Sequence, residues 1–231
     1  MNKRNFLIGT GSLLLEQLAY ADNSKLLTKI PIYLTIDDGP TPFMKKIVDL
    51  LGDTSKATFF LVGKNMKRTS GSKGMELAKY AVEKGHELGN HSYSHPWFSS
   101  LNLLQAQQQV ERTRDLIEKV YAQCGRTAPL FFRFPFGDTG RPGKREPGKS
   151  EGNLSYKLEL ADLLKTMGYS TYYWSAVDYQ PFSPLMKAGA VVLTHDWSNG
   201  HGVKISREYL TSNRFDLLPL PRLPVPQYEI R

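Results

Sequence analysis

Three short polar motifs carry residue types that could perform hydrolytic chemistry together. Asp37 and Asp38 form a carboxylate pair before a Gly-Pro step, and His91 and His95 stand four residues apart. His195 follows much later, after another apolar run. Two histidines and one carboxylate, with coordination positions left for water, form a catalytic zinc site, whereas structural zinc sites are usually closed by four protein ligands. The motifs together predict metal-assisted hydrolysis.

The adjacent carboxylates of Asp37 and Asp38 need a special backbone to serve one site. Neighbouring residues on an extended strand point to opposite sides, so both reach one site only if the chain turns, and Gly39-Pro40 supplies a turn. Because nearby carboxylates repel, we expect one to ligate a cation and the other to remain a base. Taken alone, Asp-Asp-Gly-Pro is also an ordinary turn sequence.

Apolar runs alternate with helix-like stretches along the chain, which is typical of β/α units around a parallel sheet. The expected strands are 32–36, 57–62, 86–90, 131–134, 170–174 and 190–194. The expected helices are 44–51, 75–84, 103–121 and 158–167. Each polar motif follows an expected strand. Since β/α barrels carry their sites at the carboxyl ends of the strands, the motifs should meet at one edge.

The composition limits the class of protein. A length of 231 residues suits one domain, and 40% hydrophobic with 23% charged residues indicates a globular chain. The net charge of +8 favours an acidic partner, such as an anionic glycan, a cell-wall polymer, a membrane surface or nucleic acid. We expect no nucleic-acid partner, because the sequence has no basic helix and no RNA-binding aromatic signature.

The N-terminus has the pattern of an export signal. Lys3 and Arg4 precede an apolar stretch, and Ala19-Tyr20-Ala21 forms a small-residue cleavage pattern. We therefore expect residues 1–21 to be a signal peptide, 22–231 to be the catalytic domain, and the protein to be periplasmic, cell-wall-associated or extracellular. The alternative is an ordinary first helix. No other apolar run approaches the roughly 18 residues of a transmembrane segment.

The motifs, taken in order, resemble those of the polysaccharide deacetylases of carbohydrate esterase family 4, also called the chitooligosaccharide deacetylase homology domain. The resemblance runs from Thr35 to Asp196. It implies an α/β fold, a distorted and incomplete (β/α) barrel with parallel strands. It also implies an acetylated glycan as substrate and one divalent metal, for which Zn²⁺ fits a His₂Asp set best.

The resemblance assigns roles to the first three motifs. Asp37 would be the general base, and Asp38, His91 and His95 would ligate the metal. The third motif reads Arg-Phe-Pro-Phe-Gly from Arg133, which would hold and tune the base.

Further residues would contact the substrate. In the third motif Pro135 and Phe136 would lie at the substrate, with the Phe136 backbone N–H facing the oxyanion. In the fifth motif Leu193 would line the acetyl pocket and His195 would be the general acid.

The fourth motif departs from the family pattern. Its first Asp is replaced by Ser175, and Tyr179 stands where the family has Trp. Asp178 is kept and would orient the catalytic histidine, while Tyr179 would form part of the pocket wall. Beyond Asp196 we expect the closing helix and strand of the family to be short or absent. The segment 138–157, rich in Gly, Pro and basic residues, is expected to be a long loop.

These observations favour a metal-dependent hydrolase that removes N-acetyl groups from an N-acetylglucosamine-containing polysaccharide, peptidoglycan or chitin-like. The nearest alternatives are an O-acetyl esterase or a small-amide hydrolase of the same fold. A non-catalytic glycan-binding relative is a further alternative, although such a protein is expected to lose the base, a metal ligand or the acid.

Overall fold

The computed structural model of the chain describes residues 29–68, 73–139, 154–177, 185–197 and 199–222. The expected signal peptide at residues 1–21 lies outside these ranges, as do Asp178 and Tyr179. Among the described helices, none combines the length and the apolarity that crossing a membrane requires.

The centre of the described structure is one sheet in which every strand pairing is parallel. Its strands are β1 (Ile30–Gly39), β2 (Thr58–Leu61), β3 (Glu87–Asn90), β4 (Phe131–Phe132), β5 (Ser170–Thr171), β6 (Ala176–Val177), β7 (Val191–His195) and β8 (Phe215–Leu218). Their order is β5-β4-β3-β2-β1-β7-β6, and β8 pairs with the first half of β1.

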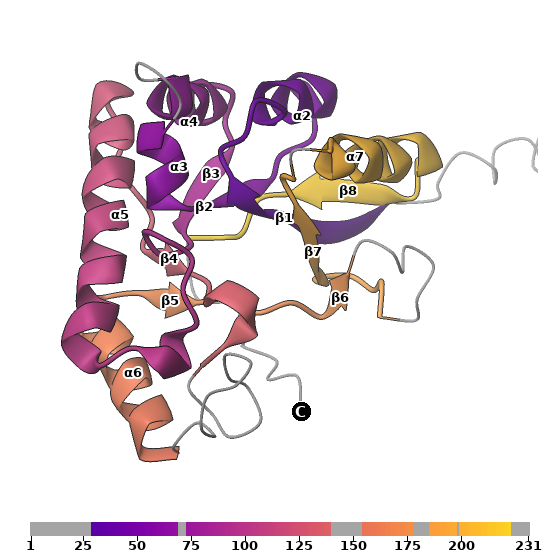
Figure 1. Cartoon of the computed structure of the whole chain (residues 1–231). Helices are drawn as coiled ribbons and strands as arrows, with labels where there is room; N and C mark the ends of the chain where they lie inside the picture. Colours follow the sequence, from indigo (N-terminus) through magenta and orange to yellow (C-terminus); the bar gives the residue numbers. More distant parts are fainter. Residues whose placement is uncertain (1–28, 69–72, 140–153, 178–184, 198, 223–231) are drawn as a thin grey trace, which may run out of the picture.

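Helices lie along the top and the left of this sheet in the view of Figure 1. They are α2 (Met44–Leu51), α3 (Gly63–Arg68), α4 (Lys73–Glu83), α5 (Leu103–Gln123), α6 (Leu154–Thr166) and α7 (His201–Ser212), with 3₁₀ turns η2 (Phe98–Ser100) and η3 (Pro135–Gly137). The two end strands of the order, β5 and β6, do not pair with each other in the described residues, so the barrel stays open there. The fold is therefore the expected distorted, incomplete (β/α) barrel.

The central strand β1 separates an apolar layer from a polar one. Ile32, Leu34 and Ile36 are fully buried on one face, where they join the core formed with the helices. The alternate residues Thr35 and Asp37 point to the opposite face, because side chains alternate along a strand. The interior of the barrel thus holds the polar groups of the site.

The four helices predicted from the apolar periodicity are present as α2, α4, α5 and α6, whereas α3 was not predicted. α2 spans the predicted residues and buries Met44, Ile47, Val48 and Leu51, one face of a helix. α5 begins at a capping box, in which the Asn102 side chain accepts from the Gln105 N–H and the Gln105 side chain accepts from the Asn102 N–H. All six expected strands are present, with ends that differ by a few residues.

The prediction for the C-terminal part was wrong. The closing helix is present as α7, which buries Val203, Ile205 and Tyr209, and β8 follows it. Gly200 adopts a left-handed conformation, φ 76°, at the helix N-cap and so starts α7 rather than extending a loop. Pro219, the first proline after α7, lies beyond β8, which pairs with β1.

The expected loop at 138–157 is shorter than predicted. Its last residues, from Leu154 onward, belong to α6, which buries Leu160 and Leu164. Residues 140–153 lie outside the described ranges.

Candidate active site and metal centre

A cavity of about 160 Å³ lies at the carboxyl ends of β1 and β7, beside the chain that leaves β3 and β4. It is lined by Asp37, Asp38, His91, His95, Phe134, Phe136, Gly137, Trp174, Leu193, His195 and Trp197. Most of the residues predicted for the site therefore meet in one place, although they come from four strand ends. The parallel arrangement explains this convergence, since all strands end at the same edge.

The two carboxylates share the site because β1 changes course at Asp38. Its φ of 72° is left-handed, and the pairing register with β2 shifts between Asp37 and Gly39. The sequence places the turn at Gly39-Pro40, whereas the structure places the break one residue earlier. Such a conformation costs a non-glycine residue roughly 1–3 kcal/mol. The Asn65 side-chain amide helps to hold it by donating to the Asp38 carbonyl at 2.9 Å.

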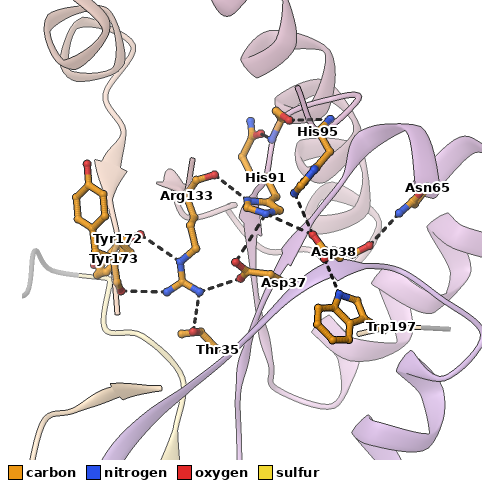
Figure 2. Close-up of polar contacts among 12 residues, drawn as sticks. Thr35, Asp37, Asp38, Asn65, His91, His95, Arg133, Tyr172, Tyr173 and Trp197 are labelled. Carbon is orange, nitrogen blue, oxygen red and sulfur yellow. Dashed lines mark hydrogen bonds and ion pairs between the residues drawn. The ribbon is translucent and has the colours of Figure 1, made fainter. Parts of the chain in front are cut away.

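The two candidate ligand histidines, His91 and His95, lie in a loop beyond β3. Ser92 and His95 have left-handed φ values of 64° and 59°. The Asn90 side-chain oxygen accepts from the Ser92 N–H at 2.9 Å, and Ser92 Oγ accepts from the His95 N–H at 3.1 Å. These bonds hold the loop so that both imidazoles face Asp38 (Figure 2).

Asp38, His91 and His95 present three ligand atoms that all lie within 4.8 Å of one another. Asp38 Oδ1 is 3.2 Å from His95 Nε2 and 3.5 Å from His91 Nε2. Within the described residues this buried oxygen accepts no hydrogen bond. An unpartnered buried carboxylate oxygen facing two imidazole nitrogens fits a divalent cation, which would supply the missing positive partner.

The tautomer of His91 also suits a metal ligand. Its Nδ1 lies 2.8 Å from the Arg133 carbonyl oxygen, which can only accept, so Nδ1 carries a proton and Nε2 is the nitrogen left for a metal. Burial by itself lowers the pKa of His91, but the carboxylates of Asp37 and Asp38 outweigh it and raise that pKa above its ordinary 6.5.

The charge on Asp38 is favoured by its neighbours. Burial by itself raises the pKa of this carboxyl group, but the His91 and His95 imidazoles outweigh that effect and hold it well below its ordinary 3.8. Asp38 is therefore ionised across the neutral pH range, as a metal ligand must be.

Arg133 holds Asp37 from inside the barrel. Its Nη1 donates to Asp37 Oδ1 at 2.8 Å and to Thr35 Oγ1 at 2.7 Å. Nε and Nη2 donate to the carbonyls of Tyr172 and Tyr173, both at 3.1 Å. The guanidinium is fully buried, which lowers its pKa, and the Asp37 carboxylate opposes that effect.

The Phe60 ring packs against the Arg133 guanidinium. Arg133 Cζ lies 4.2 Å from the centroid of the Phe60 ring. The ring in turn covers Gly89 on β3, where a Cβ atom would come within 2.5 Å of it. A side chain at position 89 would therefore displace the ring that supports Arg133.

His195 reaches the cavity from the strand next to Asp37. The parallel register pairs Asp37 with His195 and Thr35 with Leu193, so all four side chains share one face of the sheet. The His195 ring stacks on Trp197, with centroids 4.6 Å apart. Leu193 lines the cavity and is 6% exposed.

The third motif forms the opposite wall. Pro135 begins η3, and Phe136 has a left-handed φ of 57°. The Phe136 ring stacks on Trp97 at 4.2 Å and contacts His95 edge-on at 4.5 Å. Its N–H belongs to the first turn of η3, where helical N–H groups have no partner within the helix.

Three residues that organise the site are not among the predicted site residues. Trp197 donates to Asp38 Oδ2 at 2.9 Å, and Asn65 donates to the Asp38 carbonyl. Asp196 accepts two hydrogen bonds from Thr41 and donates its backbone N–H to the Asp37 carbonyl at 2.8 Å. The only available signal was the position of Asp196 and Trp197 directly after His195, and Asn65 gave none.

The sequence is also similar to known proteins. Residues 25–145 match the family model described as polysaccharide deacetylase. The peptidoglycan-N-acetylglucosamine deacetylase of Bacillus cereus is 29% identical over 192 residues, which is 80% of this chain and 62% of that protein. The peptidoglycan-N-acetylmuramic acid deacetylase PdaC of Bacillus subtilis is 35% identical over 108 residues, 46% of this chain and 21% of that protein. The chain thus spans less than two thirds of either relative.

The fold is also found among solved structures. A family 4 carbohydrate esterase from Streptomyces lividans, solved in complex with acetate, superposes with a TM-score of 0.60 and 23% sequence identity. The match covers 84% of this chain and 94% of that one. At this identity the likeness establishes the fold.

Proposed function

The chain belongs to the polysaccharide deacetylase family, and on that premise we propose that it is a metal-dependent hydrolase of N-acetyl groups on an N-acetylglucosamine-containing polysaccharide, peptidoglycan or chitin-like. One observation carries the proposal. Asp38 Oδ1 and the Nε2 atoms of His91 and His95 converge beside Asp37 and His195 in one cavity. The names of the relatives, peptidoglycan deacetylases among them, support this class of substrate.

The metal centre consists of Asp38, His91 and His95. Zinc matches one carboxylate and two imidazoles best among divalent cations. A cation held there would supply Lewis acidity that polarises an amide carbonyl and lowers the pKa of water.

Asp37 acts as the general base. Arg133 holds its Oδ1, which leaves Oδ2, 3.7 Å from His91 Nε2, turned toward the cavity. Asp37 takes a proton from water as the oxygen of that water bonds to the acetyl carbon. The negative charge that develops on the former carbonyl oxygen is met by the Phe136 backbone N–H, with Pro135 fixing the turn that presents it.

His195 acts as the general acid. The amine cannot leave as an anion, so His195 gives its proton to the nitrogen as the carbon–nitrogen bond breaks, and acetate and a free amine result. Asp178 orients His195 in this scheme, Leu193 packs against the acetyl methyl group, and Tyr179 completes the pocket wall. All the residues whose loss marks a binding-only relative are present.

We also propose that residues 1–21 are a signal peptide and that 22–231 form the catalytic domain of an exported protein. The family match begins at residue 25, and peptidoglycan lies outside the cytoplasm. Protein recovered from outside the producing cell should begin at Asp22 when its N-terminus is sequenced. Recovery only from the cytosol, beginning at Met1, would contradict export.

Acetate release tests the activity directly. The protein is stripped of metal with a chelator, then assayed with and without added zinc on N-acetylglucosamine oligomers, acetylated xylan and a small acetamide. We expect zinc-dependent release from the oligomers. Release only from xylan would indicate an O-acetyl esterase, and release only from the acetamide would indicate a small-amide hydrolase. No release from any substrate would indicate a non-catalytic glycan-binding relative.

A further inference from the structure

Trp197 contacts two functional groups at once. Its indole N–H donates to Asp38 Oδ2 at 2.9 Å, and its ring stacks on His195 with centroids 4.6 Å and planes 24° apart (Figure 2 shows the first contact). Asp38 comes from the end of β1 and His195 from the end of β7. One side chain therefore joins a metal ligand on one strand to the proposed acid on the next.

The hydrogen bond fixes the rotation of the Asp38 carboxylate. An indole N–H is a donor only, so it can neither ligate a cation nor take a proton. By occupying Oδ2 it leaves Oδ1 as the oxygen that faces His91 and His95. A charge-assisted bond of this kind is stronger than a neutral one, and partners of this kind orient metal ligands in many sites.

The ring stack fixes the plane of the His195 imidazole. The Trp197 ring also contacts His201 on α7, with centroids 5.2 Å apart, so it contacts two imidazoles. Asp196, between His195 and Trp197, is 1% exposed and bound to Thr41, so the segment that carries the indole is anchored. Trp197 itself is 44% exposed, and packing alone does not account for an N–H directed at a carboxylate.

We propose that Trp197 is a positioning residue that sets the Asp38 carboxylate for metal binding and the His195 ring for proton transfer. The proposal rests on the proposed metal site. It makes two effects separable, since the N–H serves Asp38 and the ring serves His195. A phenylalanine keeps a ring without the N–H, and a glutamine keeps an N–H without the ring.

Zinc affinity of the metal-free protein, measured by chelator competition without substrate, tests the first effect. Trp197→Phe should bind zinc about 10- to 100-fold more weakly than the wild type, and Trp197→Gln should retain most of the affinity. Trp97→Phe is the matched control, because the Trp97 ring stacks on Phe136 and, within the described residues, donates no hydrogen bond to a metal ligand. Its zinc affinity should equal that of the wild type.

Turnover at saturating zinc tests the second effect. Trp197→Gln should have a kcat about tenfold or more lower than that of Trp197→Phe, because only the phenylalanine keeps a ring against His195. Thermal unfolding of each variant shows whether it is folded. If the wild type binds no zinc, the metal site and the proposal both fail. If the wild type binds zinc and Trp197→Phe binds it equally well, or Trp97→Phe loses as much, only the positioning role is overturned.

Discussion

At the scale of single residues, three polar groups of the site have one atom held by the protein and another turned to the cavity. His91 Nδ1 donates to the Arg133 carbonyl, Asp37 Oδ1 accepts from the Arg133 guanidinium, and Asp38 Oδ2 accepts from the Trp197 indole. The remaining atoms, Nε2, Oδ2 and Oδ1, are the ones that the proposed chemistry uses. Reactive groups held in this way need little reorganisation during a reaction.

Zinc affinity should depend on pH through His91. The carboxylates of Asp37 and Asp38 raise the pKa of His91 above 6.5 in the metal-free protein, so protons compete with the cation for Nε2. Affinity is therefore expected to fall as the pH drops from about 8 to about 6, with proton release on binding. Calorimetric titrations in buffers of different ionisation enthalpy measure both. An affinity that stays constant over this range, without proton release, would speak against His91 as a ligand.

At the scale of elements, hydrogen bonds join the segment after β7 to the turn after β1. Asp196 Oδ2 accepts from the Thr41 N–H at 2.8 Å, and Oδ1 accepts from the Thr41 hydroxyl at 2.6 Å. Gly39 lies directly against this carboxylate, and a Cβ there would come within 3.1 Å of Asp196 Oδ2. Burial raises the pKa of Asp196, and the Thr41 bonds partly offset that cost. These hydrogen bonds fix the position of the site residues at the end of β1 relative to those at the end of β7.

Thr41→Val should weaken the attachment of Asp196 to the turn after β1 and so lower the stability of the protein. The substitution leaves the buried Asp196 Oδ1 without its hydroxyl donor, so the free energy of unfolding should fall by about 1–3 kcal/mol. Thr211→Val is the matched control, because its hydroxyl bonds only to carbonyls of its own helix on an exposed face. The free energy of unfolding of Thr211→Val, measured in urea, should stay within about 0.5 kcal/mol of the wild type. Equal losses in the two variants would remove the special role of the Thr41 bond.

Local patterns predict elements in proportion to their length and periodicity. α2 and α5 carry long apolar faces and were predicted nearly to the residue, whereas β6 has only two residues and left no pattern. The site shows the same division. The ligand and base types are visible in the sequence, but the Trp197–Asp38 bond joins residues 159 positions apart and requires the fold.

At the scale of the whole molecule, a buried carboxylate ties the last described segment to the sheet. Glu87 at the start of β3 accepts from the Tyr121 hydroxyl at 2.5 Å and from Arg126 at 3.1 Å. Arg222, beyond β8, donates to both Glu87 oxygens at 3.1 Å. Glu87 is 7% exposed, so these donors replace the water that it loses on folding. β3, α5 and the chain after β8 therefore stabilise one another.

Glu87→Gln should destabilise the protein without altering the site. Because both arginines are partly exposed, we expect a loss of about 2 kcal/mol, below the 3–5 kcal/mol of a fully buried pair. The control Glu83→Gln removes an exposed pair with Lys79 and should change the free energy of unfolding by less than about 0.5 kcal/mol. Urea unfolding measures both. A Glu87 variant as stable as the control would show that this cluster contributes little.

The central claim is that Asp37 acts as a base beside a bound metal rather than as a ligand. The measurement is acetate release from N-acetylglucosamine oligomers by zinc-reconstituted wild type and Asp37→Asn, with zinc content determined on the same samples. The account predicts that Asp37→Asn retains its zinc and loses at least about 100-fold in turnover. Normal turnover in Asp37→Asn, or loss of zinc together with activity, would contradict it.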